Sequence, residues 1–215
     1  MSPPSRHQAA RQVKVAPTYQ EARARLLAAR QGPGHVLGLD QATATGWALF
    51  DLISKRCVLS GRSVSPDGER EVVATLTAHP GLDWASTLVV FEDHSTFPIA
   101  AGTTSARVLL SLGESRQRWK TLLSDAGHSP EARLLVPPHD WRKLLGTRAN
   151  VGRDAWKQQA VMWASALVGR QVAFDDEAEA IVIGMWGVHE GLIRWATRRA
   201  EQGATARKPR RKKQP

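Results

Sequence analysis

The sequence predicts an α/β domain with a five-stranded mixed sheet flanked by helices, in which three antiparallel strands are followed by two parallel ones. Three observations lead to this fold class. Short β-type runs stand in a row early in the chain, two more apolar runs follow between long helical patterns, and 42% of the 215 residues are hydrophobic. That fraction is sufficient for a substantial core. Helical segments between the later strands act as crossovers, which are typical of parallel neighbours.

The predicted elements follow one another along the chain in a βββαβαβ order and then continue as helices. Apolar residues at helical spacings favour Trp119, Trp156 and Trp163 as core residues, whereas Trp47 and Trp141 are candidates for stacking on a base or sugar. We expect strands over 35–40, 45–51, 57–64, 87–92 and 132–136, and helices over 69–79, 103–125, 141–145, 154–168 and 175–197.

The positive charge lies mainly at the two ends of the chain. Thirty Lys and Arg against twenty Asp and Glu give a net charge of +10. Residues 1–34 carry six basic and one acidic side chain, and residues 197–215 carry eight and one, so residues 35–196 are nearly neutral. We therefore predict a basic N-terminal extension with a short helix (1–34), a folded domain (35–200) and a basic disordered tail (201–215). Such arms suit a polyanionic partner.

The composition also bears on the compartment. The single cysteine, Cys57, cannot form an internal disulfide, which favours a reducing compartment such as the cytoplasm. No apolar run reaches the roughly 20 residues of a membrane span, so no membrane partner is predicted. The Arg-rich, acid-poor N-terminus leaves an organellar location as an alternative.

Two carboxylates stand at the ends of predicted strands. Asp40 closes an apolar strand just before a turn of small residues, and Glu92 closes the run at 87–92 and is followed by Asp93 and His94. If the fourth strand lies beside the first, Asp40 and Glu92 meet at one sheet edge. Asp93 and His94 are candidates for extra ligands. The alternative interpretation is that Asp40 caps a turn and that Asp93 and His94 are solvated.

Two more carboxylates open the last helical pattern. Asp176 and Glu179 are three residues apart, so on a helix they face the same way. Acidic residues also suit a first helical turn, and a purely structural cap is the alternative for Asp176. Glu179 stands where the helix becomes apolar, and a buried carboxylate there needs a cation or a hydrogen-bond partner.

Four carboxylates in a protein that otherwise favours phosphate binding indicate metal-assisted phosphodiester hydrolysis. Carboxylates repel a phosphodiester unless divalent cations lie between them. Two Mg²⁺ ions about 3.5–4 Å apart would activate a water and stabilise the leaving oxygen. We therefore predict Asp40, Glu92, Asp176 and Glu179 as catalytic metal ligands, with Mn²⁺ as a possible substitute for Mg²⁺.

These motifs together resemble the RuvC family of Holliday-junction resolvases, within the RNase H-like superfold. The resemblance extends over roughly residues 35–190 and rests on Leu37-Gly38-Leu39-Asp40, Thr45-Gly46-Trp47-Ala48, Glu92 and Asp176-x-x-Glu179-Ala180. It implies an Mg²⁺-dependent endonuclease that cuts four-way DNA junctions symmetrically. It also implies a homodimer, formed through the helix at 103–125, since a two-fold substrate calls for two active sites. It makes residues 35–200 an RNase H-like nuclease domain, and it suits a cytoplasmic, nucleoid-associated protein or one that a phage encodes.

The resemblance also suggests individual roles. Lys157 matches the family's lysine at the scissile phosphate, Arg142 or Lys143 a second such residue, and Phe97 the aromatic wedge at the junction centre. Further basic residues in the same stretch are candidates for a DNA channel, although exposed helix faces are the alternative. They are Arg107, Arg116, Arg148 and Arg153.

The sequence departs from the family at two points. The family usually has Asp-Pro-Gly where this chain has Asp40-Gln41-Ala42, and often a second Asp at the position of Glu179. Two other functions remain as alternatives: a catalytically inactive resolvase-like module that binds branched nucleic acid, or a fragment of an actin-like or sugar-kinase-like ATPase, whose first motif is similar.

Overall fold

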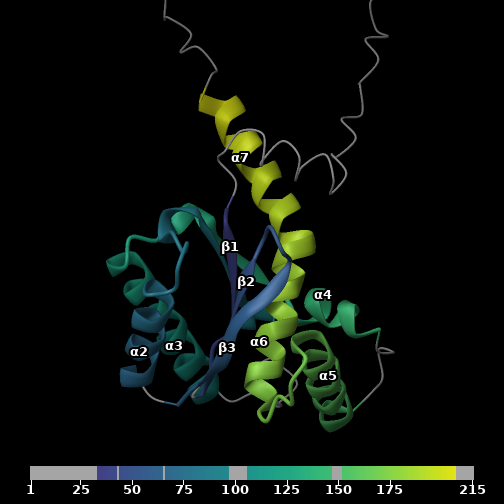
Figure 1. Cartoon of the computed structure of the whole chain (residues 1–215). Coiled ribbons are helices and arrows are strands. Elements are labelled where there is room, and N and C mark those ends of the chain that lie inside the picture. The colour runs from purple at the N-terminus through teal and green to yellow at the C-terminus, as the bar shows by residue number, and fades with distance from the viewer. Residues whose placement is uncertain (1–32, 43, 65, 97–105, 147–151, 207–215) are drawn as a thin grey trace, which may run out of the picture.

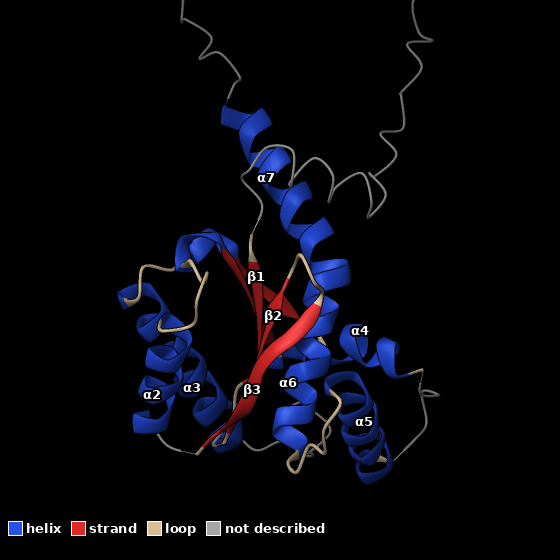
Figure 2. Cartoon of the chain, viewed as in Figure 1, coloured by secondary structure: helices blue, strands red, loops and turns tan. Residues whose placement is uncertain are grey.

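The computed structural model describes residues 33–42, 44–64, 66–96, 106–146 and 152–206. Its centre is a five-stranded sheet in the order β3-β2-β1-β4-β5 (Figure 2). The first three strands pair antiparallel, whereas β4 runs parallel to β1 and β5 parallel to β4. The predicted mixed sheet is therefore confirmed. The strands are β1 (His35–Asp40), β2 (Thr45–Asp51), β3 (Arg56–Ser63), β4 (Thr87–Glu92) and β5 (Arg133–Val136).

Helices cover both faces of the sheet, as Figure 1 shows. Helices α2 (Pro66–Thr77) and α3 (Ala106–Asp125) pack on one face around Trp119, Leu76 and Phe91. Helices α5 (Arg153–Val168) and α6 (Asp175–Trp186) pack on the other, where Trp141, Trp156 and Trp186 join the core. The other helices are α4 (Pro138–Arg142) and α7 (Leu192–Ala206), with a π-helical turn (Gly187–Gly191) between α6 and α7. Short 3₁₀ turns lie at Trp84–Ser86, His94–Thr96, Pro130–Ala132 and Lys143–Leu145.

Several predicted boundaries need correction. Helix α2 begins at Pro66 rather than Glu69, because proline is well suited to a first helical turn and Asp67 follows it. Helix α4 likewise begins at Pro138 rather than Trp141. The helix expected over 175–197 is interrupted by the π-helical turn. There, a Cβ atom on Gly187 would lie 2.6 Å from Val36, so this turn touches the sheet closely.

Other expectations fall outside the described residues. The N-terminal extension, the start of the helix expected at 103, Phe97, Arg148 and residues 207–215 are among them. Within the described part of the chain, no helix is both long enough and apolar enough to cross a bilayer.

Three glycines bring α6 directly onto β1 and β2. A Cβ atom on Gly38 would lie 2.4 Å from the carbonyl oxygen of Ala180, and one on Gly46 only 1.8 Å from that of Asp176. A Cβ atom on Gly184 would overlap the ring of Phe50. Because none of these positions has room for a side chain, the start of α6 lies against the strands that lead into and out of Asp40.

Candidate active site

The candidate site lies at the edge of the sheet where β1 and β4 end. The two strands are parallel neighbours, with Leu39 opposite Phe91, so Asp40 and Glu92 follow at the same edge. Their convergence, which was predicted from the crossover rule, is therefore a direct result of strand order. Both carboxylates are buried. Oxygen atoms of Asp40 and Glu92 and a ring nitrogen of His94 all lie within 4.8 Å of one another.

Glu179 reaches the same place from α6. It is buried, although it stands only one turn into a helix whose start carries Asp175, Asp176 and Glu177. Its negative charge contributes to a raised pKa of Asp40, and the charge of Glu92 contributes to a raised pKa of Glu179. The close contact of α6 with Gly38 and Gly46 is what places this carboxylate beside the strand ends.

The pKa values of this cluster are strongly displaced. Burial, followed by repulsion from Glu179 and Glu92, raises the pKa of Asp40 well above its usual range. Burial and the charge of Glu92 raise the pKa of Glu179 to about 8. Desolvation and like charge both disfavour an anion, so the cluster holds more negative charge than its surroundings compensate. Groups of this kind mark functional sites more often than chance.

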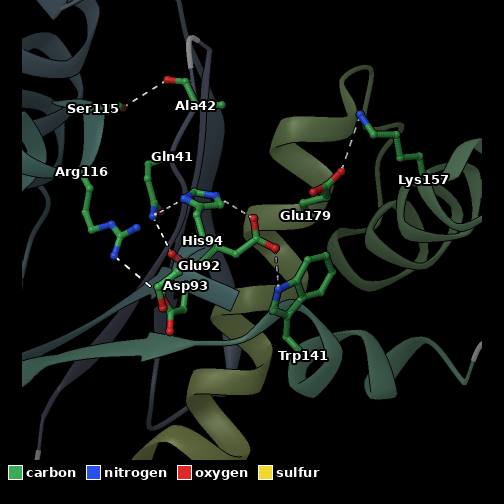
Figure 3. Close-up of polar contacts among 11 residues, drawn as sticks. Gln41, Ala42, Glu92, Asp93, His94, Ser115, Arg116, Trp141, Lys157 and Glu179 are labelled. Atoms are coloured by element: carbon green, nitrogen blue, oxygen red, sulfur yellow. Dashed lines mark hydrogen bonds and ion pairs between the residues drawn. The ribbon is translucent and has the colours of Figure 1, made fainter. Parts of the chain in front are cut away.

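Asp176 takes a more peripheral position than Glu179. Its carboxylate accepts a hydrogen bond from Nε of Arg62 on β3 at 2.8 Å, while its charge still raises the pKa of Asp40. Lys157 on α5 donates to Asp175 and lies 3.9 Å from Glu179 (Figure 3). Burial lowers the pKa of Lys157, but the hydrogen bond to Asp175 and the charge of Glu179 outweigh it and raise that pKa.

Three side chains hold Glu92 and its loop. Nε1 of Trp141 donates to Oε1 of Glu92 at 3.1 Å, and Nε2 of His94 lies 3.0 Å from Oε2 (Figure 3). Gln41 donates to the backbone carbonyl of Glu92 at 2.6 Å. Trp141 is wholly buried and Trp47 nearly so, so both sequence-based candidates for stacking on DNA are core residues of the described structure instead.

Helix α3 supports the two loops that carry the site. The hydroxyl of Ser115 donates to the carbonyl of Ala42, and Arg116 lies 3.9 Å from Asp93 (Figure 3). Arg116 is largely buried at this contact, so it joins α3 to the loop after β4 rather than presenting a free charge.

The other basic candidates differ in their contacts and in their exposure to solvent. The guanidinium of Arg142 lies 3.9 Å from the centre of the Trp156 ring and is near enough to Glu179 to lower that residue's pKa. Lys143 is exposed and pairs with Asp140 at 3.0 Å. Arg107 and Arg153 are exposed at the starts of α3 and α5.

Sequence reasoning did not find Gln41 and Trp141 as partners of Glu92. Gln41 looks like an ordinary turn residue, and Trp141 is, from the sequence, a candidate for stacking on a base or sugar. The one available signal was the buried-type strand ending in Glu92-Asp93-His94, which places an imidazole two residues after the carboxylate.

The donor set fits a divalent cation. Asp40, Glu92 and Glu179 are buried carboxylates that repel one another, and the ammonium of Lys157 lies 3.9 Å from Glu179. Carboxylate oxygen is the ligand that Mg²⁺ and Mn²⁺ prefer. A bound cation would remove the repulsion that now raises the pKa values of Asp40 and Glu179.

Two solved structures of similar fold are of RuvC from Thermus thermophilus. RuvC of Thermus thermophilus in complex with a Holliday-junction substrate superposes with a TM-score of 0.52, at 13% identity, over 74% of this chain and 94% of that chain. A second Thermus thermophilus RuvC structure gives a TM-score of 0.50, also at 13% identity, over 77% and 96%. No family model matches the sequence, and no curated protein matches it. The chain therefore has a RuvC-like fold, and the predicted RNase H-like architecture is confirmed.

Proposed function

We propose that this protein is a Mg²⁺-dependent endodeoxyribonuclease that resolves four-way DNA junctions by paired, symmetric hydrolysis of phosphodiester bonds. One observation carries the proposal: the carboxylates of Asp40 and Glu92 meet at the end of two parallel strands, and Glu179 joins them from α6, in a RuvC-like fold. The substrate of the neighbouring RuvC complex supports branched DNA as the substrate class.

The proposal assigns Asp40, Glu92 and Glu179 to cation binding, with Asp176 at the margin. When bound, Mg²⁺ would make a water more acidic and neutralise charge on the phosphodiester. The protein supplies the rigid frame: both strand ends are fixed by the sheet, and Trp141 holds one oxygen of Glu92. Such preorganisation is the main way a site of this kind lowers a barrier.

Lys157 is assigned to the scissile phosphate. Its ammonium lies at the margin of the carboxylate cluster and is partly exposed, between Asp175 and Glu179. A phosphate that enters beside these carboxylates would meet this cation first. The charge of Arg142, at the end of α4, acts on Glu179, and that of Arg153, at the start of α5, acts on Lys157, so both suit contacts with neighbouring phosphates.

The direct test is cleavage of labelled DNA with and without Mg²⁺, using four-way, forked and linear substrates. The wild-type protein should cut the four-way junction at symmetric positions and need Mg²⁺ for it. Asp40→Asn should abolish cleavage and retain junction binding in a gel-shift assay. Equal nicking by Asp40→Asn would exclude Asp40 from the chemistry. Tight junction binding without any cutting by the wild type would identify a non-catalytic binding module instead.

A further inference from the structure

His94 is a buried imidazole whose place among the carboxylates leaves two functions open. One of its ring nitrogens is close enough to Asp40 and Glu92 to share a cation with them. Imidazole is a poor ligand for Mg²⁺ and a good one for Fe²⁺, Ni²⁺ and Zn²⁺. Whether His94 binds the cation or positions a carboxylate therefore affects which metal the site prefers.

The contacts of Gln41 determine which ring nitrogen carries the proton. Nε2 of Gln41 lies 2.6 Å from the backbone carbonyl oxygen of Glu92, so this atom is the donating amide nitrogen. The same nitrogen lies 3.4 Å from Nδ1 of His94. Since an amide nitrogen only donates, Nδ1 must accept and carries no proton. The proton of the neutral ring is then on Nε2.

This tautomer makes His94 a donor to Glu92. Nε2 lies 3.0 Å from Oε2 of Glu92, while Trp141 donates to Oε1 at 3.1 Å (Figure 3). Both oxygens of the carboxylate are thus held by donors, and each keeps a second lone pair. In this arrangement both nitrogens of His94 are engaged in hydrogen bonds.

The buried amide of Gln41 does not favour the stability of the folded protein. Its side chain is wholly buried, and among the described residues its Oε1 atom has no hydrogen-bond partner. A buried acceptor without a partner costs about 1–3 kcal/mol. An apolar residue of similar shape would avoid that cost, which indicates that the two contacts made by the amide nitrogen have another use.

We propose that Gln41 is a positioning residue. It fixes His94 as the Nε2–H tautomer, which orients the carboxylate of Glu92 and keeps the imidazole from binding the cation. The inference rests on the proposed function for its metal, and it adds a determinant of metal preference. Without the amide, the ring can adopt the other tautomer, and Nε2 becomes available as a ligand. The metal preference of the site then shifts towards cations that accept nitrogen ligands.

The tautomer is measurable in the metal-free protein. Long-range ¹H–¹⁵N NMR of histidine-labelled protein distinguishes the two tautomers, and His94→Gln identifies the His94 signals among the seven histidines. The wild type should show Nε2–H at His94. Gln41→Met should give a mixture or the Nδ1–H form, whereas Gln158→Leu, a change at an exposed position on α5, should leave it unchanged. Nδ1–H in the wild type would overturn the proposal, and this result needs only His94→Gln, which assigns the signals.

Metal binding provides the second readout. By calorimetry, Gln41→Met should weaken Mg²⁺ binding by about 10–100-fold, a typical loss for residues that orient ligands, and weaken Ni²⁺ binding less. In the His94→Gln background, Gln41→Met should cause no further loss, because the two residues act as one unit. Additive losses would contradict the proposal. If the wild type fails to cut DNA, the proposed function fails while the tautomer and metal data still decide this inference.

Discussion

Glu179 illustrates how burial changes the chemistry of a single residue. On an exposed helix start, a glutamate is an ordinary anion that is stabilised by the helix dipole. Here the helix start lies against the sheet, and the pKa of Glu179 rises to about 8 because the carboxylate is buried and faces Glu92. The same residue that suits a cation is therefore a source of instability when no cation is bound.

In the presence of a chelator, we expect Glu179→Gln to stabilise the protein. The folded-state pKa lies above the unfolded one, so the folded protein binds more protons between about pH 4.5 and 8, and its stability falls as pH rises through that range. The gain from the amide should therefore be larger at pH 8 than at pH 5, on the order of a few kcal/mol at most. Urea denaturation at both pH values measures it.

Glu71→Gln, a change at an exposed position on α2, is the matched control and should give little change at either pH. Added Mg²⁺ should reverse the benefit of Glu179→Gln, since it stabilises the wild type more than the variant. A pH-independent effect of the substitution would mean that Glu179 is not held in the charged cluster.

At the scale of single elements, the contact between α6 and the sheet is decisive. The motif containing Gly46 looks, in sequence, like a turn into a second strand. In the structure, Gly46 is the place where the backbone of α6 passes within a side chain's width of β2. This contact fixes where the start of α6, with Asp176 and Glu179, lies relative to Asp40.

Gly46→Ala should therefore destabilise the fold and move the acidic helix start. The added methyl group would lie 1.8 Å from a backbone oxygen of Asp176, which cannot turn aside as a side chain could. Overpacking of this kind costs about 1–3 kcal/mol, and cleavage should fall even where the protein remains folded. Urea denaturation together with the junction assay measures both effects.

Gly113→Ala is the matched control, because a Cβ atom on Gly113 of α3 meets nothing within 4 Å. It should be neutral or stabilise the helix by up to about 1 kcal/mol. If Gly46→Ala behaves like Gly113→Ala, the close approach of α6 to β2 is not what positions the acidic residues.

At the scale of the whole molecule, α7 leads away from the candidate site (Figure 1). Glu179 stands near the end of β1, whereas Gly187 contacts Val36 near its beginning, so α6 runs antiparallel to β1. Helix α7 continues in that direction away from the site (Figure 1). Its 15 residues span roughly 22 Å, so the end of α7 at Ala206 lies far from the carboxylates.

This arrangement bears on the basic tail. Removing residues 203–215, which include six Lys and Arg, should weaken junction binding and flatten its salt dependence without changing the cut positions. For every phosphate that the tail neutralises, the truncation should reduce the slope of log K against log salt by about 0.9. Filter binding across a salt series, beside mapping of the cuts, tests this. An unchanged slope would exclude the tail from phosphate binding.

Symmetric cutting requires two sites, and we propose that α3 joins them in a homodimer. The first half of α3 contributes little to the described core, and Leu110 on it is 68% exposed. Leu110→Glu should convert a dimer to a monomer in analytical ultracentrifugation, while Met162→Glu, at a position on α5 that is 67% exposed, should not. A wild-type monomer at micromolar concentration would contradict the proposal.

The sequence by itself determined the order and type of the elements and the carboxylates that end β1 and β4. It could do so because apolar periodicity reports burial directly, and because the crossover rule makes parallel strands neighbours. The RuvC-like fold followed from the motifs at Gly38, Asp40, Gly46 and Glu179 taken together. Element boundaries were less exact where Pro66 and Pro138 extended helices towards the N-terminus.

Only the tertiary structure decided how those carboxylates are held. Gln41 and His94 are 53 residues apart, and Trp141 is 49 residues from Glu92, so no local pattern relates them. The structure also separates Glu179, inside the cluster, from Asp176, which pairs with Arg62, although both residues begin the same helix. Hydrogen bonding and desolvation depend on distances across the folded chain, and spacing along the sequence does not contain them.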